Sequence, residues 1–383
     1  MLIQKAFKFR LFPTEEQAVQ INKSIGCSRF VYNHFLDCWE KTYKQTGKGL
    51  TYNTCSKALT QLKAELPWLK EPDKFALQNS LKNLSKAYDR FFKKQAKHPR
   101  FKSKKNPNQA YKTCFTNHNI EVTDQTIKLP KLGWVRYARS RQVKGRLLSA
   151  FIRHVPSGKY FISLVAETEV KEHPKTGKAV GIDLGLLDFM TLSTGEKITN
   201  PKFGRSVEQK LRREQRKLAH RYEGAKKRIL KQKNLTLMDA RNYQKQKIKV
   251  ARLKEKISNR KTDFLHQWST KLVKNHDQLV VEDLNVKGLL KNHHLAKTIS
   301  EVSWAEFVRQ LTYKAQWYGK TLIKIDRFFP SSQRCATCGH QDGKKALHIR
   351  KWDCPQCGAH HDRDVNAALN ILHEGLKKPS IGG

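Results

Sequence analysis

Four cysteines, arranged as two pairs, constrain the fold of this chain more than any other feature of its sequence. Cys335 and Cys338 form the first pair, Cys354 and Cys357 form the second, and fifteen residues separate the pairs. Two residues between cysteines let both thiolates reach one tetrahedral ion, and the glycine after each pair permits a tight turn. An iron–sulfur site or a redox pair is the alternative, but two glycine-flanked knuckles favour zinc. We therefore predict a structural Zn²⁺ site in a small zinc ribbon at residues 331–360.

The other four cysteines are solitary, and they indicate a reducing environment. The N-terminal stretch "MLIQKAFKFRLFP" lacks the long apolar core of an export signal. Without export, isolated thiols are expected to stay reduced, which predicts a cytoplasmic protein, associated with the nucleoid if it is bacterial. These solitary residues are Cys27, Cys38, Cys55 and Cys114.

The net charge of the chain predicts a polyanionic partner. Lysine and arginine number 76 against 33 aspartates and glutamates, which gives +43 over 383 residues. With 38% hydrophobic residues the chain is globular, so charge of this size needs a polyanion to neutralise it. A membrane surface is the rival to nucleic acid, but no apolar run approaches the about 20 residues of a spanning helix and no amphipathic anchor is evident. RNA and DNA together suit so much positive charge.

The first half of the chain reads as a β domain interrupted by helices. "KAFKFRLFP" alternates apolar and basic residues up to Pro13, which predicts a strand. From Thr14 to about Ala96 the pattern is helical, and "TEEQ" at 14–17 resembles a capping box. Short strands return between 111 and 170, separated by glycine and proline. The first strand is expected to join them in a small barrel or sheet, with the helical region as an insertion.

The second half alternates buried strands with helices. "AVGIDLGLLDFMTLSTGEKI" predicts a strand, a turn and a second strand, and "HDQLVVEDLNV" and "TLIKIDRFFP" predict two further strands. Residues 205–263 predict an antiparallel helical hairpin whose charge is mainly positive. A charged helix face is either only solvated or in contact with phosphates, and the excess of positive over negative residues favours phosphate contact. "SWAEFVRQLTYKAQWYG" predicts an amphipathic helix, and the tail from Gly375 is expected to fray.

Three carboxylates stand where apolar elements begin or end. Asp183 follows "AVGI", Glu282 follows "QLVV", and Asp364 opens the last helix. Singly, Asp183 could be a turn residue, Glu282 a paired strand end, and the neighbouring Asp362 a helix N-cap. Together, in a basic nucleic-acid binder, they suit a phosphodiesterase centre in which two Mg²⁺ ions lie about 4 Å apart. Oxygen ligands suit Mg²⁺ and thiolates suit Zn²⁺, so the two sites should hold different metals.

Several sequence blocks, in fixed order, resemble the TnpB family of transposon-encoded RNA-guided DNA endonucleases, which are related to type V CRISPR effectors. These blocks are "GIDLG", "VVEDLNV", the two cysteine pairs and "HDRDVNAALNI". The resemblance extends forward through "RFVYNHFL", "GKGLTY", "DKFALQNSLKNL" and "LPKLGWVR", and so covers nearly the whole chain. In the family's last motif the metal-binding acid directly precedes x-Asn-Ala, which implies Asp364 as the ligand and Asp362 as a cap or supporting group.

The resemblance also implies a multidomain α+β and α/β fold. Its parts would be a wedge-like β-barrel (1–13 and 111–175), a helical recognition lobe (14–110), a RuvC-like, RNase H-like nuclease domain (176–330 and 361–383, including the basic hairpin 205–263) and the inserted zinc ribbon (331–360). Readers of a short transposon-adjacent DNA motif would include amide and aromatic side chains, which can contact adenine edges and thymine methyls. Local capping and packing are the alternative roles of these candidates, which are Tyr52, Phe75, Gln78, Thr116 and Asn117.

The expected function is an RNA-guided, Mg²⁺-dependent endonuclease that cuts double-stranded DNA with one RuvC-like site. The catalytic and Mg²⁺-binding residues would be Asp183, Glu282 and Asp364, and the guide RNA would come from the transposon end. One alternative is a guided DNA-binding repressor that has lost cleavage, against which the three intact acids argue. Another is an unguided zinc-ribbon accessory protein of transposition, against which the separate lobe and barrel argue.

Overall fold

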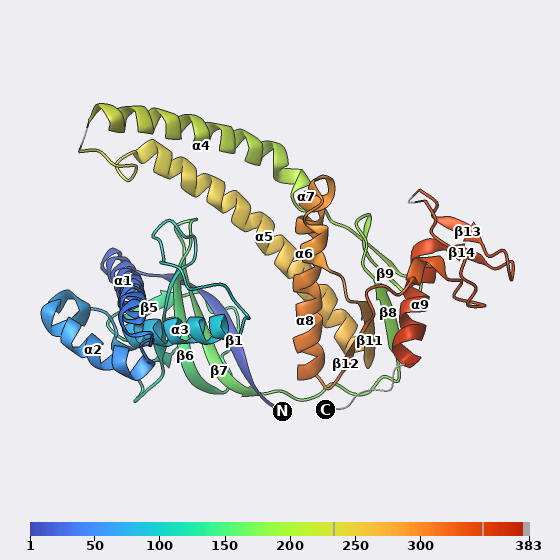
Figure 1. The fold of residues 1–383 in the computed structure, drawn as a ribbon, viewed down its shortest axis with the longest axis horizontal. Helices are drawn as coiled ribbons and strands as arrows, with labels where there is room; N and C mark the ends of the chain where they lie inside the picture. Colours follow the sequence, from blue (N-terminus) through green and yellow to red (C-terminus); the bar gives the residue numbers. More distant parts are fainter. Residues whose placement is uncertain (233, 347, 378–383) are drawn as a thin grey trace. The chain divides into compact units, whose positions relative to one another are not determined.

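The computed structural model describes residues 1–232, 234–346 and 348–377, and it divides the chain into two compact units. One unit is Leu2–Glu169, and the other consists of Met1 and Val170–Gly383. Figure 1 shows a sheet with helices in each of them. None of the described helices has the length and apolarity that crossing a membrane requires.

The first unit is built on a seven-stranded antiparallel sheet that joins the start of the chain to later strands. Its order is β2-β6-β7-β1-β5-β4-β3, and β1 pairs along most of its length with β7. Alternate β1 residues, including Phe7, Phe9 and Leu11, are buried in the core of this unit, as the alternating pattern predicts. The strands are β1 (Leu2–Phe12), β2 (Gln109–Cys114), β3 (Glu121–Val122), β4 (Thr126–Leu129), β5 (Gly133–Tyr137), β6 (Arg146–His154) and β7 (Tyr160–Glu169).

Three helices are inserted between β1 and β2. Thr14 and Gln17 form the predicted capping box at the start of α1, because each side chain accepts a hydrogen bond from the other residue's backbone. The helices share a core of their own, to which the α3 stripe contributes Leu77, Leu81 and Leu84. The elements are α1 (Glu15–Thr46), α2 (Tyr52–Glu65), the 3₁₀ turn η1 (Pro67–Lys70) and α3 (Lys74–Phe92).

The second unit contains a five-stranded mixed sheet in the order β10-β9-β8-β11-β12. β8, β11 and β12 are parallel, whereas β9 pairs antiparallel with both β8 and β10. Because parallel strands end at one edge of a sheet, the last residues of β8 and β11, Asp183 and Glu282, lie at the same edge. The strands are β8 (Ala179–Asp183), β9 (Asp188–Leu192), β10 (Lys197–Thr199), β11 (Gln278–Glu282) and β12 (Thr321–Ile325).

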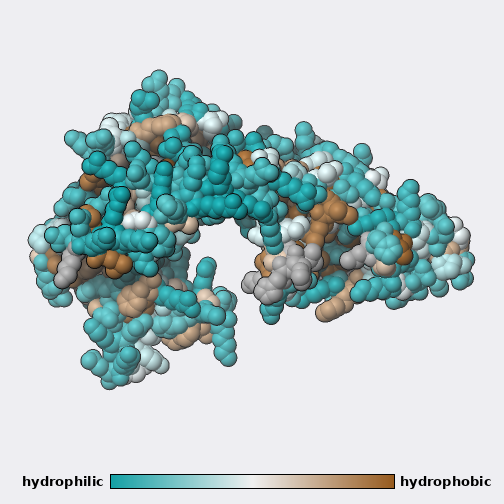
Figure 2. Space-filling model, turned by 90° about the horizontal axis from the view of Figure 1, so that it is seen from above, coloured by the Kyte–Doolittle hydropathy of each residue, from teal (hydrophilic) through white to brown (hydrophobic). Residues whose placement is uncertain are grey.

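The predicted basic hairpin is confirmed as α4 (Arg205–Lys231) and α5 (Arg241–Asn275), although α5 extends twelve residues beyond the predicted end. The second half of α5 packs with α8 (Trp304–Trp317), where Leu265 and Phe307 share the core under the sheet. Along α4 only Glu214 and Ala225 are buried, so this helix is solvated on most faces. The face drawn in Figure 2 is largely hydrophilic, as the composition predicts. Two short helices, α6 (Val286–Leu289) and α7 (His293–Val302), precede α8.

Helix α9 (Arg363–Lys377) rests directly on β8 and carries the third acid. A Cβ atom at Gly181 would lie 2.1 Å from the carbonyl oxygen of Ala368, so glycine allows this close approach. The prediction that the chain frays from Gly375 is wrong, since Gly375 is buried in α9 against Val280. The helix continues to Lys377, and residues 378–383 lie outside the described part of the chain.

Candidate active site and zinc site

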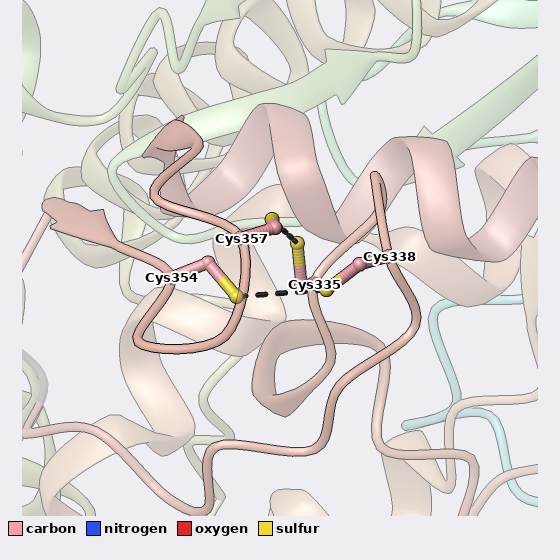
Figure 3. Close-up of side chains that lie close together, drawn as sticks. All are labelled: Cys335, Cys338, Cys354 and Cys357. Carbon is pink, nitrogen blue, oxygen red and sulfur yellow. Dashed lines mark hydrogen bonds between the residues drawn. The ribbon is translucent and has the colours of Figure 1, made fainter.

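The four paired cysteines converge on one point. Their Sγ atoms all lie within 4.8 Å of one another, and Figure 3 shows the side chains turned toward a common centre. The Sγ–Sγ distances are 3.8 Å between Cys335 and Cys357 and 3.6 Å between Cys338 and Cys354. Four sulfurs about 2.3 Å from a tetrahedral Zn²⁺ would lie about 3.8 Å apart. The predicted set therefore fits Zn²⁺ by both donor chemistry and spacing.

The cysteine site is joined to α9 by a short hairpin. The hairpin consists of β13 (Lys351–Asp353) and β14 (His360–Asp362), and β14 continues directly into α9. His361 on β14 is buried, packs against Trp352, and places Nε2 3.0 Å from Sγ of Cys335. A ring N–H at this position can donate to a thiolate, as supporting groups around metal ligands commonly do. The metal site therefore fixes the chain directly before the last acid.

Asp362 caps α9. Its Oδ1 atom accepts hydrogen bonds from the backbone N–H groups of Asp364 and Val365, each at 3.1 Å. Its Oδ2 atom receives a 2.7 Å ion pair from Lys197 on β10. A residue whose carboxylate satisfies the first helical N–H groups is an N-cap, so the capping role considered for Asp362 is what the structure displays.

The three carboxylates singled out in the sequence lie close enough to influence one another. Burial raises the pKa of Asp183 to about 8, and the neighbouring charges of Glu282 and Asp364 add to this effect. Arg363 and Arg350 oppose it by lowering the pKa of the same carboxyl. Burial also raises the pKa of Glu282. Burial and neighbouring negative charge disfavour the ionised forms of these acids, and carboxylate oxygens are ligands that Mg²⁺ prefers. The cluster therefore fits a site that a divalent cation would neutralise.

Each of the other two acids has a partner from the zinc-ribbon region. The hydroxyl of Ser331, in the 3₁₀ turn η2 (Ser331–Gln333), donates to Oε1 of Glu282 at 2.5 Å. Arg350 donates Nη1 to both oxygens of Asp364, at 3.2 and 3.3 Å. Within the described residues, the four cysteines are the one group of three or more potential ligands whose donor atoms converge. In this structure, Glu282 and Asp364 therefore interact with protein side chains, Ser331 and Arg350 respectively.

Two buried asparagines of α9 hold the start of the ribbon. Asn370 donates to the carbonyl oxygens of Ser331 and Arg334, at 2.8 and 2.6 Å. Asn366 donates to the Arg334 carbonyl at 2.7 Å and accepts from the backbone N–H of Ala336 at 2.9 Å. Being four residues apart, the two side chains share one face of the helix. This face links the helix of Asp364 to the segment whose serine orients Glu282.

The raised pKa of Asp183 predicts an unusual pH dependence of stability. Folding favours the protonated carboxyl, so stability is lost as pH rises from about 4 through the folded pKa near 8. In EDTA at pH 8, we expect Asp183→Asn to melt about 5 °C above the parent, with the difference shrinking toward pH 4. Differential scanning fluorimetry across this range measures it.

Asp277 provides a control of opposite sign for that experiment. A hydrogen bond from Lys320 lowers the pKa of Asp277 to about 2, so its ionised form stabilises the fold above the unfolded pKa. Asp277→Asn should therefore melt below the parent at pH 8. A destabilised Asp183→Asn variant at pH 8 would contradict the unfavourable charge that we assign to Asp183.

The candidate motif readers all lie in the first unit. Tyr52 begins α2, with the Lys82 ammonium 5.7 Å from its ring centre, and Phe75 and Gln78 are half-buried in the first turns of α3. Thr116 and Asn117 are exposed in the loop after β2, where Asn117 has a φ of 44°. Asn79 on α3 donates to the Lys112 carbonyl of β2 at 3.2 Å. This contact brings α3 beside the strand that leads into the loop.

Comparison with known proteins identifies the family. The chain is 39% identical over 385 residues to a Streptomyces pristinaespiralis protein named "Putative RNA-guided DNA endonuclease", a match that covers 99% of this chain and 91% of the relative. It is 34% identical to InsQ of Escherichia coli K12, which carries the same description, over 97% of this chain and 92% of that protein. Proteins of a mimivirus named "TnpB-like" match more distantly, at 26% identity over 57% of the chain. The chain belongs to the TnpB family.

Family profiles match three parts of this TnpB-family chain. They are described as "Probable transposase" for residues 163–293, "Cas12f1-like, TNB domain" for residues 304–371 and "Helix-turn-helix domain" for residues 1–48. The second profile spans the cysteine site and the beginning of α9. The third covers a strand followed by the single continuous helix α1, so the structure of this segment differs from the helix-turn-helix of its description.

Solved structures show that the TnpB-family chain has a mixed α/β, multidomain fold similar to that of type V effectors. A structure titled as a Cas12f1–sgRNA–target DNA complex aligns with a TM-score of 0.54 at 11% identity, over 97% of this chain and 99% of the other. The mini-RNA-guided endonuclease CRISPR-Cas phi3 also gives 0.54 at 11% identity, over 100% and 94% of the two chains.

Sequence reasoning missed the residues that hold the acids in place. Ser331 and Arg350 are 49 and 14 residues away from the acids that they contact, so no local pattern predicts either pair. Asn366 and Asn370 carried a usable signal, because two asparagines four residues apart on an otherwise apolar helix face require buried partners.

Proposed function

We propose that this TnpB-family protein is an RNA-guided, Mg²⁺-dependent endonuclease that cuts double-stranded DNA beside a short transposon-adjacent motif. The observation that carries the proposal is the proximity of Glu282 and Asp364 to Asp183, a strand-end carboxyl whose pKa is raised to about 8. A perturbed group at the centre of an acidic cluster is a feature of functional sites. The names of the relatives, read together with this centre, support nuclease chemistry.

We propose that the second unit is a RuvC-like nuclease domain, formed by residues 176–330 and 361–383 with the zinc ribbon 331–360 inserted. An antiparallel strand pair continued by parallel strands, with acids at their ends, is the arrangement expected of an RNase H-like nuclease. In the first unit, the seven-stranded sheet would serve as the wedge-like barrel (1–13 and 111–175), and the helices as the recognition lobe (14–110).

The residues of the centre have distinct tasks in this proposal. Asp183, Glu282 and Asp364 would hold Mg²⁺ as a two-ion site, and the bound ions would supply activation of water and stabilisation of the leaving oxygen. Asp362 fixes the first turn of α9 and with it the position of Asp364. Ser331 fixes one oxygen of Glu282, which leaves the other oxygen for a ligand. Arg350 lies against Asp364 and supplies positive charge beside the phosphodiester that would be cut.

The net charge of +43 supports two nucleic-acid partners, a guide RNA from the transposon end and the double-stranded target DNA. Base pairing with the guide would select the target, so the protein need read only the shape of the duplex and the adjacent motif. Tyr52, Phe75, Gln78, Thr116 and Asn117 are proposed to read this motif. The exposed basic faces of α4 and α5 are proposed to contact phosphates.

The direct test is cleavage of a plasmid library that carries the guide's target beside randomised flanking bases. We expect the guide-loaded protein to linearise a subset of the plasmids in Mg²⁺ and none in EDTA. Sequencing of the ends then gives the motif. If the protein binds the target but leaves every plasmid intact in Mg²⁺, it is a guided repressor and the nuclease proposal fails.

The guide itself should stabilise the protein. Ligand at 100 times its Kd stabilises a folded state by about 2.7 kcal/mol, so the cognate RNA should raise the melting temperature, and this gain should diminish with added salt. An unrelated RNA of equal length is the control. Equal shifts with both RNAs would favour an unguided nucleic-acid-binding protein.

A further inference from the structure

A groove of about 560 Å³ lies beside the proposed catalytic centre and has no part in the functions assigned so far. Its lining includes Glu282, Leu184, which follows Asp183, and Trp304 and Tyr313 of α8. Lys324 and Arg327, from β12 and the loop after it, also face the groove. A volume between about 300 and 1,000 Å³ is typical of sites that enclose a small ligand or one residue of a polymer.

The groove combines an aromatic side chain with cations. The Trp304 side chain is buried, and its Nε1–H group has no acceptor among the described residues. That nitrogen is shielded from solvent, so it does not open into the groove. Lys324 is exposed and makes no ion pair within the described part of the chain, whereas Arg327 is held against Asp283 at 3.0 Å. The lining therefore offers the aromatic ring of Tyr313 and a free positive charge on Lys324.

We propose that this groove binds one nucleotide of the target DNA strand, next to the phosphodiester presented to Glu282. Lys324 contacts its phosphate, and the Tyr313 ring contacts its sugar or base. The inference rests on the proposed nuclease function and adds a substrate subsite to it. DNA is favoured over the guide RNA because the groove shares Glu282 with the centre that would cut DNA.

Photocrosslinking locates the occupant without requiring cleavage. The guide-loaded, full-length protein is assembled in EDTA with target DNA that carries 5-iododeoxyuridine in place of thymidine, irradiated, digested and mapped by mass spectrometry. We expect crosslinks to the peptides that contain Trp304 and Tyr313. Crosslinks from DNA that map only outside the groove would overturn the proposal, and so would groove crosslinks formed by an iodouridine-labelled guide but not by the DNA.

An exposed lysine makes the matched test, because its replacement leaves the core intact. Lys324→Gln should lower the groove crosslink yield about fivefold and lower the salt dependence of crosslinking by about one phosphate contact. Lys178→Gln, at an exposed position directly before β8, removes the same charge outside the groove and should change neither quantity. An unchanged yield with Lys324→Gln would contradict the phosphate contact. Groove crosslinks to a parent that never cuts in Mg²⁺ would keep the subsite and reject the nuclease.

Discussion

Asp183→Ala, Glu282→Ala and Asp364→Ala will each reduce guided DNA cleavage about a thousandfold or more. Each substitution removes an oxygen ligand from one shared cation site, so combining two of them should add little to the loss. Guided binding to the target should survive, because phosphate contacts and base pairing supply that affinity. Single-turnover cutting of a labelled target, together with filter binding of the same duplex, separates the two effects.

Asp362→Asn is the control for the third acid, since it lies two residues away on the same segment. The asparagine oxygen can still accept from the Asp364 and Val365 N–H groups, so the helix remains capped. Its ion pair with Lys197 is lost, but such a partly exposed pair contributes about 1 kcal/mol or less. Substantial cleavage should therefore remain. An inactive Asp362→Asn beside an active Asp364→Ala would exchange the roles that we assign to the two aspartates.

The second large effect will come from Cys354→Ser. Three thiolates and a hydroxyl should bind Zn²⁺ far more weakly, so zinc content should fall from one ion per chain to almost none, and residues 331–360 should become susceptible to protease. Cleavage should fall as well, because the same segment presents Ser331 to Glu282 and Arg350 to Asp364. Atomic absorption, limited proteolysis and the cleavage assay follow the three consequences.

Cys38→Ser, at a solitary cysteine of α1, is the matched substitution for this experiment. It should retain both zinc and cleavage. If Cys354→Ser keeps one tightly bound zinc, the four-thiolate site is wrong. If Cys354→Ser loses zinc but cuts at the parent rate, the contacts of the ribbon with Glu282 and Asp364 do not contribute to cleavage.

The sequence predicts those features of the fold and of the site that depend on patterns within a short segment of the chain. The cysteine spacing is a local pattern, and so is the alternation of β1 or the capping box at Thr14, and each is found in the structure. The position of Asp183 and Glu282 after apolar runs also indicates strand ends. The sequence does not indicate that Asp183 and Glu282 lie at the same edge of the sheet. Their common position follows from the parallel pairing of β8 with β11, which joins segments about a hundred residues apart.

The remainder depends on side-chain contacts between distant segments, for which local propensity carries no information. Gly181 looks like an ordinary strand residue until α9 is seen to rest on it. The predicted fraying at Gly375 failed for a related reason, because contact with Val280 in β11 stabilises a helix end that composition alone marks as weak. Ser331 and Arg350 are polar residues in a loop-rich segment, and their roles appear only when the acids come within reach.

If the protein cuts DNA as proposed, the placement of α9 determines when during synthesis the cutting centre could be completed. Asp183 and Glu282 are synthesised before the ribbon, but the helix that completes their cluster follows only after the whole ribbon has been made. Until then β8 lacks the backbone that covers Gly181, and the acidic cluster lacks its third member. Because domains generally fold as units during synthesis, a nascent chain or a product of an upstream nonsense codon would carry the parts proposed to bind nucleic acid without a complete set of the proposed catalytic acids.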